Sequence, residues 1–307
     1  MIDLSGHYRS SDPVGELIAL LDVERIDRDL FRGPAKTGAS GRAFGGQVVA
    51  QAFMAAQRSI EDDKIAHSLH AYFLRPGSEA MPIVLRVIRD FDGGSFANRR
   101  VVALQKGEPL LTLTASFHRP EAGLTHGAAM PVVPAPETLL PLDVLAERYG
   151  DTIGEKARTY LSRSSAFEMR PVGDPSFLQR GRAEPIAHTW FRMRGAVPED
   201  AGLRRSLLAY MSDYSLISSA MIAHDVNMFD HSFQTASLDH AVWFHDEAPL
   251  DDWFLYTTES DWAGRGRAHA TGTIFARDGR ILARTAQEGL MRPRPDRPAG
   301  VTIPHTP

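Results

Sequence analysis

The chain has 307 residues, no cysteine, and 34 basic against 38 acidic side chains, which gives a formal net charge of −4. The absence of cysteine excludes disulfides, thiolate nucleophiles and sulfur-ligated zinc, and it is compatible with a reducing compartment, so we expect a cytoplasmic location. The small net charge and the lack of an apolar run of roughly 18 residues argue against nucleic-acid binding and against membrane insertion.

The N-terminal part of the chain predicts helices followed by an antiparallel sheet. Residues 14–24 have helical apolar spacing, and residues 47–60 are alanine-rich with apolar residues three and four apart, entered through Gly45 and Gly46. The pattern then changes to runs rich in Val, Ile, Leu, Thr and Phe, broken by Asp-Gly and Lys-Gly turns. The predicted strands are 68–76, 82–91, 95–105 and 110–118.

A proline-rich segment separates this pattern from a second copy of it. Residues 120–165 contain four closely spaced prolines and then a helical stretch over 142–161, and we interpret them as a connector that spans the outside of the molecule. The first pattern then returns, with a single helix expected around 206–221. The strands predicted in this half are 167–172, 186–194, 237–245, 254–260, 267–276 and 281–291.

The two halves have the same order of elements and nearly the same turn spacing. Ser68-Leu69 aligns with Ser237-Leu238, and Lys106-Gly107 aligns with Asp278-Gly279. This favours a duplicated α+β unit, in which each helix packs lengthwise on its own curved sheet, over two unrelated α+β halves. The predicted divisions are 1–122 for the first unit, 123–163 for the connector, 164–295 for the second unit and 296–307 for the tail.

Several stretches resemble the acyl-CoA thioesterase II family, also called TesB-like. They include FGGQVVAQAFMAA, LHAYFLRPG, MSDYSLISSA, SLDHAVWFH and TAQEGLMR, and the resemblance runs from about Asp22 to about Arg292. It implies a double hotdog fold and the hydrolysis of fatty-acyl-CoA to free acid and coenzyme A in fatty-acid metabolism. It implies no metal and no organic cofactor.

The resemblance also implies a catalytic trio of Asp213, Ser237 and Gln287. A carboxylate can accept a proton from water, while a hydroxyl and an amide can hold that water and direct it. In the first unit, Ala115 corresponds to Gln287 and a residue near Gln47 corresponds to Asp213, so we expect one working site per chain. A backbone amide near the start of the buried helix is the expected oxyanion donor.

Each of these residues alone also has an ordinary structural interpretation. An isolated Asp in a helix is usually solvated or a local cap, and an isolated Ser or Gln is usually a strand-edge hydroxyl or a surface amide. Two other functions therefore remain open. One is a hotdog acyl-CoA dehydratase, which uses an Asp and His pair, and the other is a non-catalytic acyl-CoA binding protein.

Other charged residues are candidates to bind the phosphates of coenzyme A or a metal ion. Four arginines are candidates for the phosphates, because guanidinium groups match phosphate geometry. They are Arg99, Arg100, Arg265 and Arg267. The histidines and aspartates at 224–225, 230–231, 239–240 and 245 match no defined metal-ligand spacing. Exposed sheet edges predict a homo-oligomer, a dimer or a tetramer.

Overall fold

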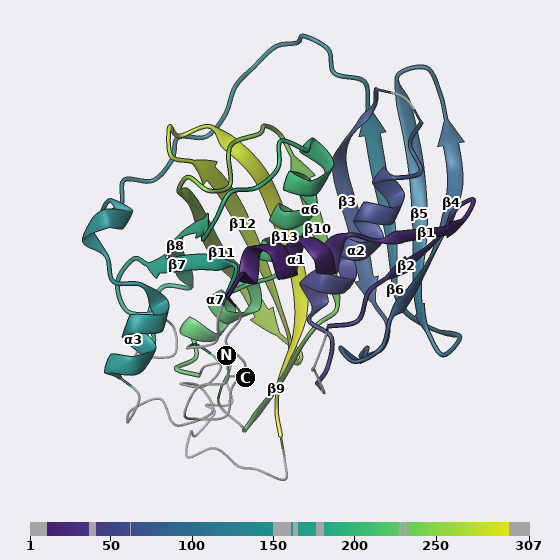
Figure 1. Ribbon diagram of the computed structural model, residues 1–307. Helices are drawn as coiled ribbons and strands as arrows, with labels where there is room; N and C mark the ends of the chain where they lie inside the picture. The colour runs from purple at the N-terminus through teal and green to yellow at the C-terminus, as the bar shows by residue number, and fades with distance from the viewer. Residues whose placement is uncertain are drawn as a thin grey trace.

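The computed structural model describes residues 11–36, 41–61, 63–149, 161, 165–175, 181–226, 229 and 232–294. One continuous sheet of 13 strands runs through the whole molecule, with the order β1-β2-β4-β5-β6-β3-β10-β13-β12-β11-β8-β7 and with β9 pairing β13 (Figure 1). The strands of the first half are β1 (Glu24–Asp27), β2 (Leu30–Gly33), β3 (Ile65–Phe73), β4 (Ile83–Asp92), β5 (Phe96–Gln105) and β6 (Glu108–His118). Those of the second half are β7 (Phe167–Pro171), β8 (Ile186–Met193), β9 (Phe233–Ser237), β10 (Asp239–Phe244), β11 (Phe254–Gly264), β12 (Arg267–Ala276) and β13 (Ile281–Pro293).

The helices pack against this sheet in two sets. The helical elements are α1 (Pro13–Leu21), α2 (Gly45–Gln57), η1 (Pro136–Thr138), α3 (Leu142–Arg148), α6 (Ala201–Ser212) and α7 (Leu216–Ile222). Helix α2 packs on β4, β5 and β6, whereas α7 packs on β11, β12 and β13. Helix α6 lies against α2, so the two halves also meet through their helices. The α+β double hotdog arrangement predicted from the sequence is confirmed.

Strands β3 and β10 join the two halves by antiparallel pairing, with Ala241 opposite His70. Each half therefore contributes its own sheet to one continuous surface, and the main core runs under both. The core includes Phe53 of α2 stacked on Phe244 of β10, with the ring centroids 5.3 Å apart. This contact buries aromatic area from both halves together, which stabilises their association.

The connector runs along the outside, as predicted, from the end of β6 over one edge of the molecule to α3 (Figure 1). It docks through its backbone carbonyls, because Trp190 Nε1 donates to Pro134 O at 3.0 Å and Arg170 donates to Pro136 O at 2.8 Å. Helix α3 begins at Leu142, as predicted, but it ends at Arg148 with Tyr149 as its C-cap, so the predicted helical stretch does not run unbroken to 161. Residues 150–160 lie outside the described part of the chain. The predicted tail over 296–307 also lies outside it.

The strand registers repeat from one half to the other. A β-bulge falls between Ala103 and Leu104 where β5 pairs β6, and another falls between Ile274 and Phe275 where β12 pairs β13. A second pair of bulges falls between Arg89 and Phe91 in β4 and between Glu259 and Trp262 in β11. Pairs of residues that face each other across the ladders can therefore be matched between the halves. Leu85↔Ala103 of the first half matches Tyr256↔Ile274 of the second, and Val101↔Leu113 matches Gly272↔Thr285. In the same way, Ala66↔Phe117 matches Ser237↔Gly289.

This shared register corrects one alignment made from the sequence. Ser237 is equivalent to Ala66, whereas the sequence pattern had matched it to Ser68. The two-residue error arose because both segments contain Ser-Leu, and a pattern of side chains alone does not fix which residues face each other across a ladder.

Candidate active site

The predicted helix around 206–221 is in fact two helices, α6 and α7, with a break at residues 213–215. Asp213 is the C-cap of α6, and Ser215 is the N-cap of α7 with a left-handed φ of 71°. A non-glycine residue in this region costs conformational energy. Asp213 itself keeps helical backbone angles, and its side chain meets the start of α2 at this break.

Two hydrogen bonds hold the carboxylate of Asp213. The backbone N–H of Gly46, in the first turn of α2, donates to Oδ2 at 2.8 Å. The side-chain amide Nε2 of Gln287, on β13, donates to Oδ1 at 2.7 Å. Gly45 leaves room for this arrangement, because a Cβ atom there would lie 2.7 Å from Oδ2 of Asp213.

Ser237 completes the trio from the end of β9. It pairs with Gly289, two residues beyond Gln287 on β13, and its hydroxyl lies near enough to Asp213 to lower the pKa of that carboxyl. Helix α7 comes close at this point, since a Cβ on Gly289 would lie 2.0 Å from Cδ1 of Ile217. The structure therefore places all three predicted residues together, from a helix end and two paired strands.

The carboxyl of Asp213 is poised to titrate near neutral pH. Burial raises its pKa to about 6, against 3.8 for a free Asp, although the hydrogen bonds from Gln287 and Gly46 and the nearby Ser237 hydroxyl each lower it. The cost of desolvating the charge exceeds these three contributions. A carboxylate with a pKa near the working pH is suited to accept a proton from water and to release it again.

A buried polar network lies behind the trio, and no local sequence signal indicates it. His240, fully buried on β10, contacts Nε2 of Gln287 through Nδ1 at 3.2 Å and Oγ of Ser212 through Nε2 at 2.8 Å. The hydroxyl of Tyr256 donates to the backbone carbonyl of Ser212 at 2.9 Å and contacts Oγ1 of Thr285 at 2.9 Å. This network holds the last turn of α6, and so the position of the neighbouring Asp213.

The first copy has none of the three groups at the equivalent positions. The register places Ala66 where the second copy has Ser237, and Ala115 where it has Gln287, as predicted for Ala115. The strand registers do not extend to the helices, so the predicted match of Asp213 to a residue near Gln47 stays a prediction. The start of α2 carries no carboxylate, since residues 42–48 are Arg-Ala-Phe-Gly-Gly-Gln-Val.

Among the arginines considered for coenzyme A, the prediction for Arg99 is wrong. Arg99 as a whole is 1% exposed, and its guanidinium donates to Ser59 Oγ at 2.9 Å and to Asp92 Oδ1 at 2.6 Å, so it is a structural group inside the first unit. Arg100 and Arg267 are at the surface and pair with Asp90 and Glu288.

Within the described ranges, no three His, Asp or Glu side chains are grouped so that they could hold a metal ion. Of the residues considered for a metal, those at 230–231 lie outside these ranges. The described helices include none that is long and apolar enough to cross a bilayer.

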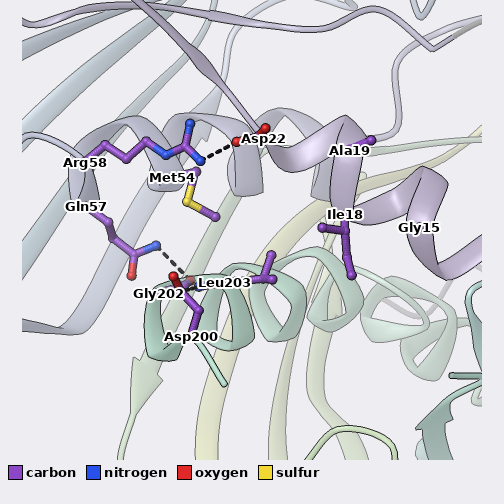
Figure 2. Close-up of a pocket in the computed structure, with 10 residues that line it drawn as sticks. All are labelled: Gly15, Ile18, Ala19, Asp22, Met54, Gln57, Arg58, Asp200, Gly202 and Leu203. Atoms are coloured by element: carbon purple, nitrogen blue, oxygen red, sulfur yellow. Dashed lines mark hydrogen bonds and ion pairs between the residues drawn. The ribbon is translucent and has the colours of Figure 1, made fainter. Parts of the chain in front are cut away.

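A cavity of about 530 Å³ lies at the other end of α6, between α1, the C-terminal turn of α2 and Gly202 (Figure 2). Its polar groups are largely satisfied by one another, because Gln57 Nε2 donates to Gly202 O at 3.1 Å and Arg58 pairs with Asp22. None of the candidate catalytic residues lines it. The cavity is therefore distinct from the site at Asp213.

Two family models match the chain in the order of its two halves. The model described as acyl-CoA thioesterase N-terminal domain matches residues 33–118, and the model described as acyl-CoA thioesterase matches residues 165–290. Asp213, Ser237 and Gln287 all fall within the second match.

Curated relatives extend the similarity to nearly the whole chain. Acyl-CoA thioesterase 2 of Haemophilus influenzae is 37% identical over 282 residues, which is 92% of this chain and 99% of that protein. Acyl-coenzyme A thioesterase 8 of Homo sapiens is 36% identical over 297 residues, which is 92% of each chain.

Solved structures agree with these relatives. The crystal structure of an acyl-CoA thioesterase II, TesB2, from Mycobacterium marinum has a TM-score of 0.74 and 35% identity, covering 91% of this chain and 99% of that one. A protein with a hot dog fold from Alicyclobacillus acidocaldarius has a TM-score of 0.72 at 18% identity, covering 90% of this chain and 97% of that one, and it supports the fold alone.

Proposed function

The chain belongs to the acyl-CoA thioesterase family and is an acyl-CoA thioester hydrolase, and we propose that it works through water activated at Asp213, Ser237 and Gln287. A thioester is an activated acyl group, so the protein must mainly position a nucleophile and stabilise the charge that develops on the carbonyl oxygen. The trio supplies a base and two groups that orient water.

In the proposed reaction, the ionised carboxylate of Asp213 takes a proton from water as the water oxygen bonds to the thioester carbonyl carbon. The hydroxyl of Ser237 and the side-chain oxygen of Gln287 hold the water in line. The C–S bond then breaks, and the thiolate of coenzyme A leaves and takes up the proton held by Asp213. The products are a free fatty acid and the thiol of coenzyme A.

The observation that carries this proposal is the convergence of three functional groups on a carboxyl whose pKa is raised to about 6. A raised pKa that persists despite these hydrogen bonds is typical of a carboxyl that exchanges protons during a reaction. The first copy supports the same view, because the same fold there carries Ala66 and Ala115 at the equivalent positions.

The dehydratase alternative requires a histidine that exchanges protons with substrate. His240 contacts the trio through Gln287, but both of its ring nitrogens are occupied, one by Gln287 and the other by Ser212. Burial also lowers its pKa to about 4, so it is a poor proton carrier near neutral pH. Hydrolysis is favoured over dehydration.

We also propose the setting in which this enzyme works. Arg265 and Arg267, in the hairpin beside β13, are suited to meet the phosphates of coenzyme A. The sheet ends at β1 and β7, whose edges offer pairing for a homo-oligomer. The cysteine-free composition fits a cytoplasmic role in fatty-acid metabolism. The division into units at 1–122, 123–163 and 164–295 follows the repeated order of elements.

The testing experiment follows thiol release from acyl-CoAs of short, medium and long chain, with the wild type and the variant Asp213→Asn in parallel. Turnover by the wild type and a fall of roughly a hundredfold or more in kcat for the variant are expected, since a general base is lost. Undiminished turnover by a well-folded Asp213→Asn variant would refute the assignment. Tight binding of acyl-CoA without turnover by the wild type would instead favour a binding protein.

A further inference from the structure

We propose that His240 is a positioning residue that fixes the orientation of the Gln287 side-chain amide, so that its nitrogen faces Asp213 and its oxygen is left to bind water. The inference rests on the proposed function of Gln287. His240 lies on β10, beside β13, and its contact to Gln287 crosses between these two strands at 3.2 Å.

The positions of the protons follow from counting donors. The nitrogen of the Gln287 amide carries two hydrogens and no available lone pair, so both of its contacts must be acceptors. One contact is Oδ1 of Asp213 at 2.7 Å and the other is Nδ1 of His240 at 3.2 Å. Nδ1 of His240 must therefore present its lone pair, and in the neutral ring the proton is on Nε2.

The other side of the ring is consistent with this tautomer. The hydroxyl of Ser212 donates its single hydrogen to the carbonyl of Ala209 at 3.0 Å, so its oxygen accepts from Nε2 of His240 at 2.8 Å. The result is a one-way chain of hydrogen bonds from Gln287 through His240 and Ser212 to the backbone of α6. A flipped Gln287 amide would place its oxygen against both the Asp213 carboxylate and the lone pair on Nδ1, which is doubly unfavourable.

The first copy shows that the fold does not need these polar side chains. In the shared register Leu69 occupies the position of His240, Leu85 that of Tyr256 and Leu113 that of Thr285, and all three leucines are fully or almost fully buried. A buried polar group costs free energy unless it is hydrogen-bonded, and leucine fills the same place without that cost. The polar network is thus found in the half that carries the trio.

The test compares His240→Leu, His240→Asn and Gln287→Ala, with each His240 variant also made in the Gln287→Ala background. Asparagine places a side-chain oxygen near the position of Nδ1 and can still accept from Gln287, whereas leucine cannot accept. We expect His240→Leu to lower kcat about tenfold with little change in KM, the scale of one hydrogen bond. His240→Asn should restore most of that loss, and neither substitution should lower kcat further once Gln287 is Ala.

A matched control is His188→Leu, since His188 is a half-buried strand histidine that contacts Thr257 Oγ1 at 3.1 Å, away from the trio. Its kcat should equal that of the wild type. Equal losses in His240→Leu and His240→Asn, or a further loss in the Gln287→Ala background, would overturn the inference, because His240 would then act through general packing. If His240→Leu fails to fold, the test rests on kcat of His240→Asn and of the double variant His240→Asn with Gln287→Ala. Wild-type kcat in Gln287→Ala alone would instead overturn the role of Gln287, and this inference with it.

Discussion

The backbone N–H of Gly46 donates a hydrogen bond to Oδ2 of Asp213 at 2.8 Å, and this bond joins the first copy of the duplicated unit to the site of the second. The start of α2 is a natural place for a carboxylate, because its first amides lack partners within the helix and its dipole favours negative charge. The first copy has thus kept a role in the site, although it has none of the three catalytic side chains.

The substitution Gly45→Ala is expected to lower kcat about tenfold or more while the fold is kept. The new Cβ would lie 2.7 Å from Oδ2 of Asp213 and 3.1 Å from the ring of Phe73, so the carboxylate must move away from its donors. Thiol release with saturating acyl-CoA measures the effect. Gly94→Ala is the control, because a Cβ there meets no atom within 4 Å. Equal activity of the two variants would show that the position of this carboxylate is not critical.

The rate of hydrolysis is expected to rise with pH and to reach half its maximum near pH 6. Only the ionised form of Asp213 accepts a proton, and burial raises its pKa to about 6. The measurement is kcat/KM between pH 4.5 and 8. Gln287→Ala removes a hydrogen bond that lowers this pKa, so its midpoint should lie above that of the wild type. A midpoint that stays unchanged in this variant would assign the titration to another group, such as a substrate phosphate.

Ser237→Ala and Ser237→Thr are expected to separate the hydroxyl from the rest of the side chain. Threonine keeps the hydroxyl and should retain activity within a few-fold, whereas alanine should lower kcat by about tenfold, since one group that orients water is lost. The hydroxyl also lowers the pKa of Asp213, so the rise of kcat/KM with pH should have its midpoint at a higher pH in Ser237→Ala than in the wild type. Indistinguishable pH profiles for alanine and threonine would argue that Ser237 does not bind Asp213 in solution.

Most strands could be predicted, in their order along the chain, because their side chains alternate and their turns are marked. The predicted strand 237–245 is in fact β10 together with the last residue of β9. Lys106 and Gly107 both have positive φ, as the tight hairpin between β5 and β6 requires. The break before α7 could not be predicted, because Ser215 adopts a left-handed conformation without being glycine. Surrounding packing overrides the local preference there, and the apolar spacing continues across the break.

The trio could be proposed from the family pattern, but the network behind it could not. His240 meets Ser212 and Gln287 only because β10 and β13 pair beside the end of α6. In the sequence, His240 belongs to a strand whose alternation predicts a buried residue at that position, and nothing local indicates its partners. The equivalent Leu69 satisfies the same pattern, so a hydrophobic position and a polar network look alike until the ladder is known.

His240→Leu is expected to change how stability depends on pH. Burial lowers the pKa of His240 from 6.5 to about 4, so between these values the unfolded chain binds a proton that the folded chain does not. The free energy of unfolding of the wild type therefore falls by about 3 kcal/mol as the pH falls from 6.5 toward 4, because protons bind the unfolded chain preferentially. Denaturant unfolding at several pH values should show that the free energy of unfolding of the variant rises relative to that of the wild type as the pH falls. Parallel curves would mean that folding does not lower the pKa of His240.

Ser215→Gly is expected to leave the free energy of unfolding within about 0.5 kcal/mol of the wild type. Glycine adopts the left-handed conformation without the strain that serine has there, and this gain offsets the greater freedom of glycine in the unfolded chain. Ser215→Val should lower it by about 1–2 kcal/mol, since a β-branched residue is poorly suited to a φ of 71°. Ser218→Gly, in the first turn of α7, is the comparison variant and should cost about 1 kcal/mol. It adds the lower helix propensity of glycine relative to serine, about 0.5 kcal/mol, to the loss of the hydrogen bond from Ser218 Oγ to Ser215 O. Urea unfolding measures all three. If Ser215→Gly were as costly as Ser218→Gly, the break that orients Asp213 would not be present in solution.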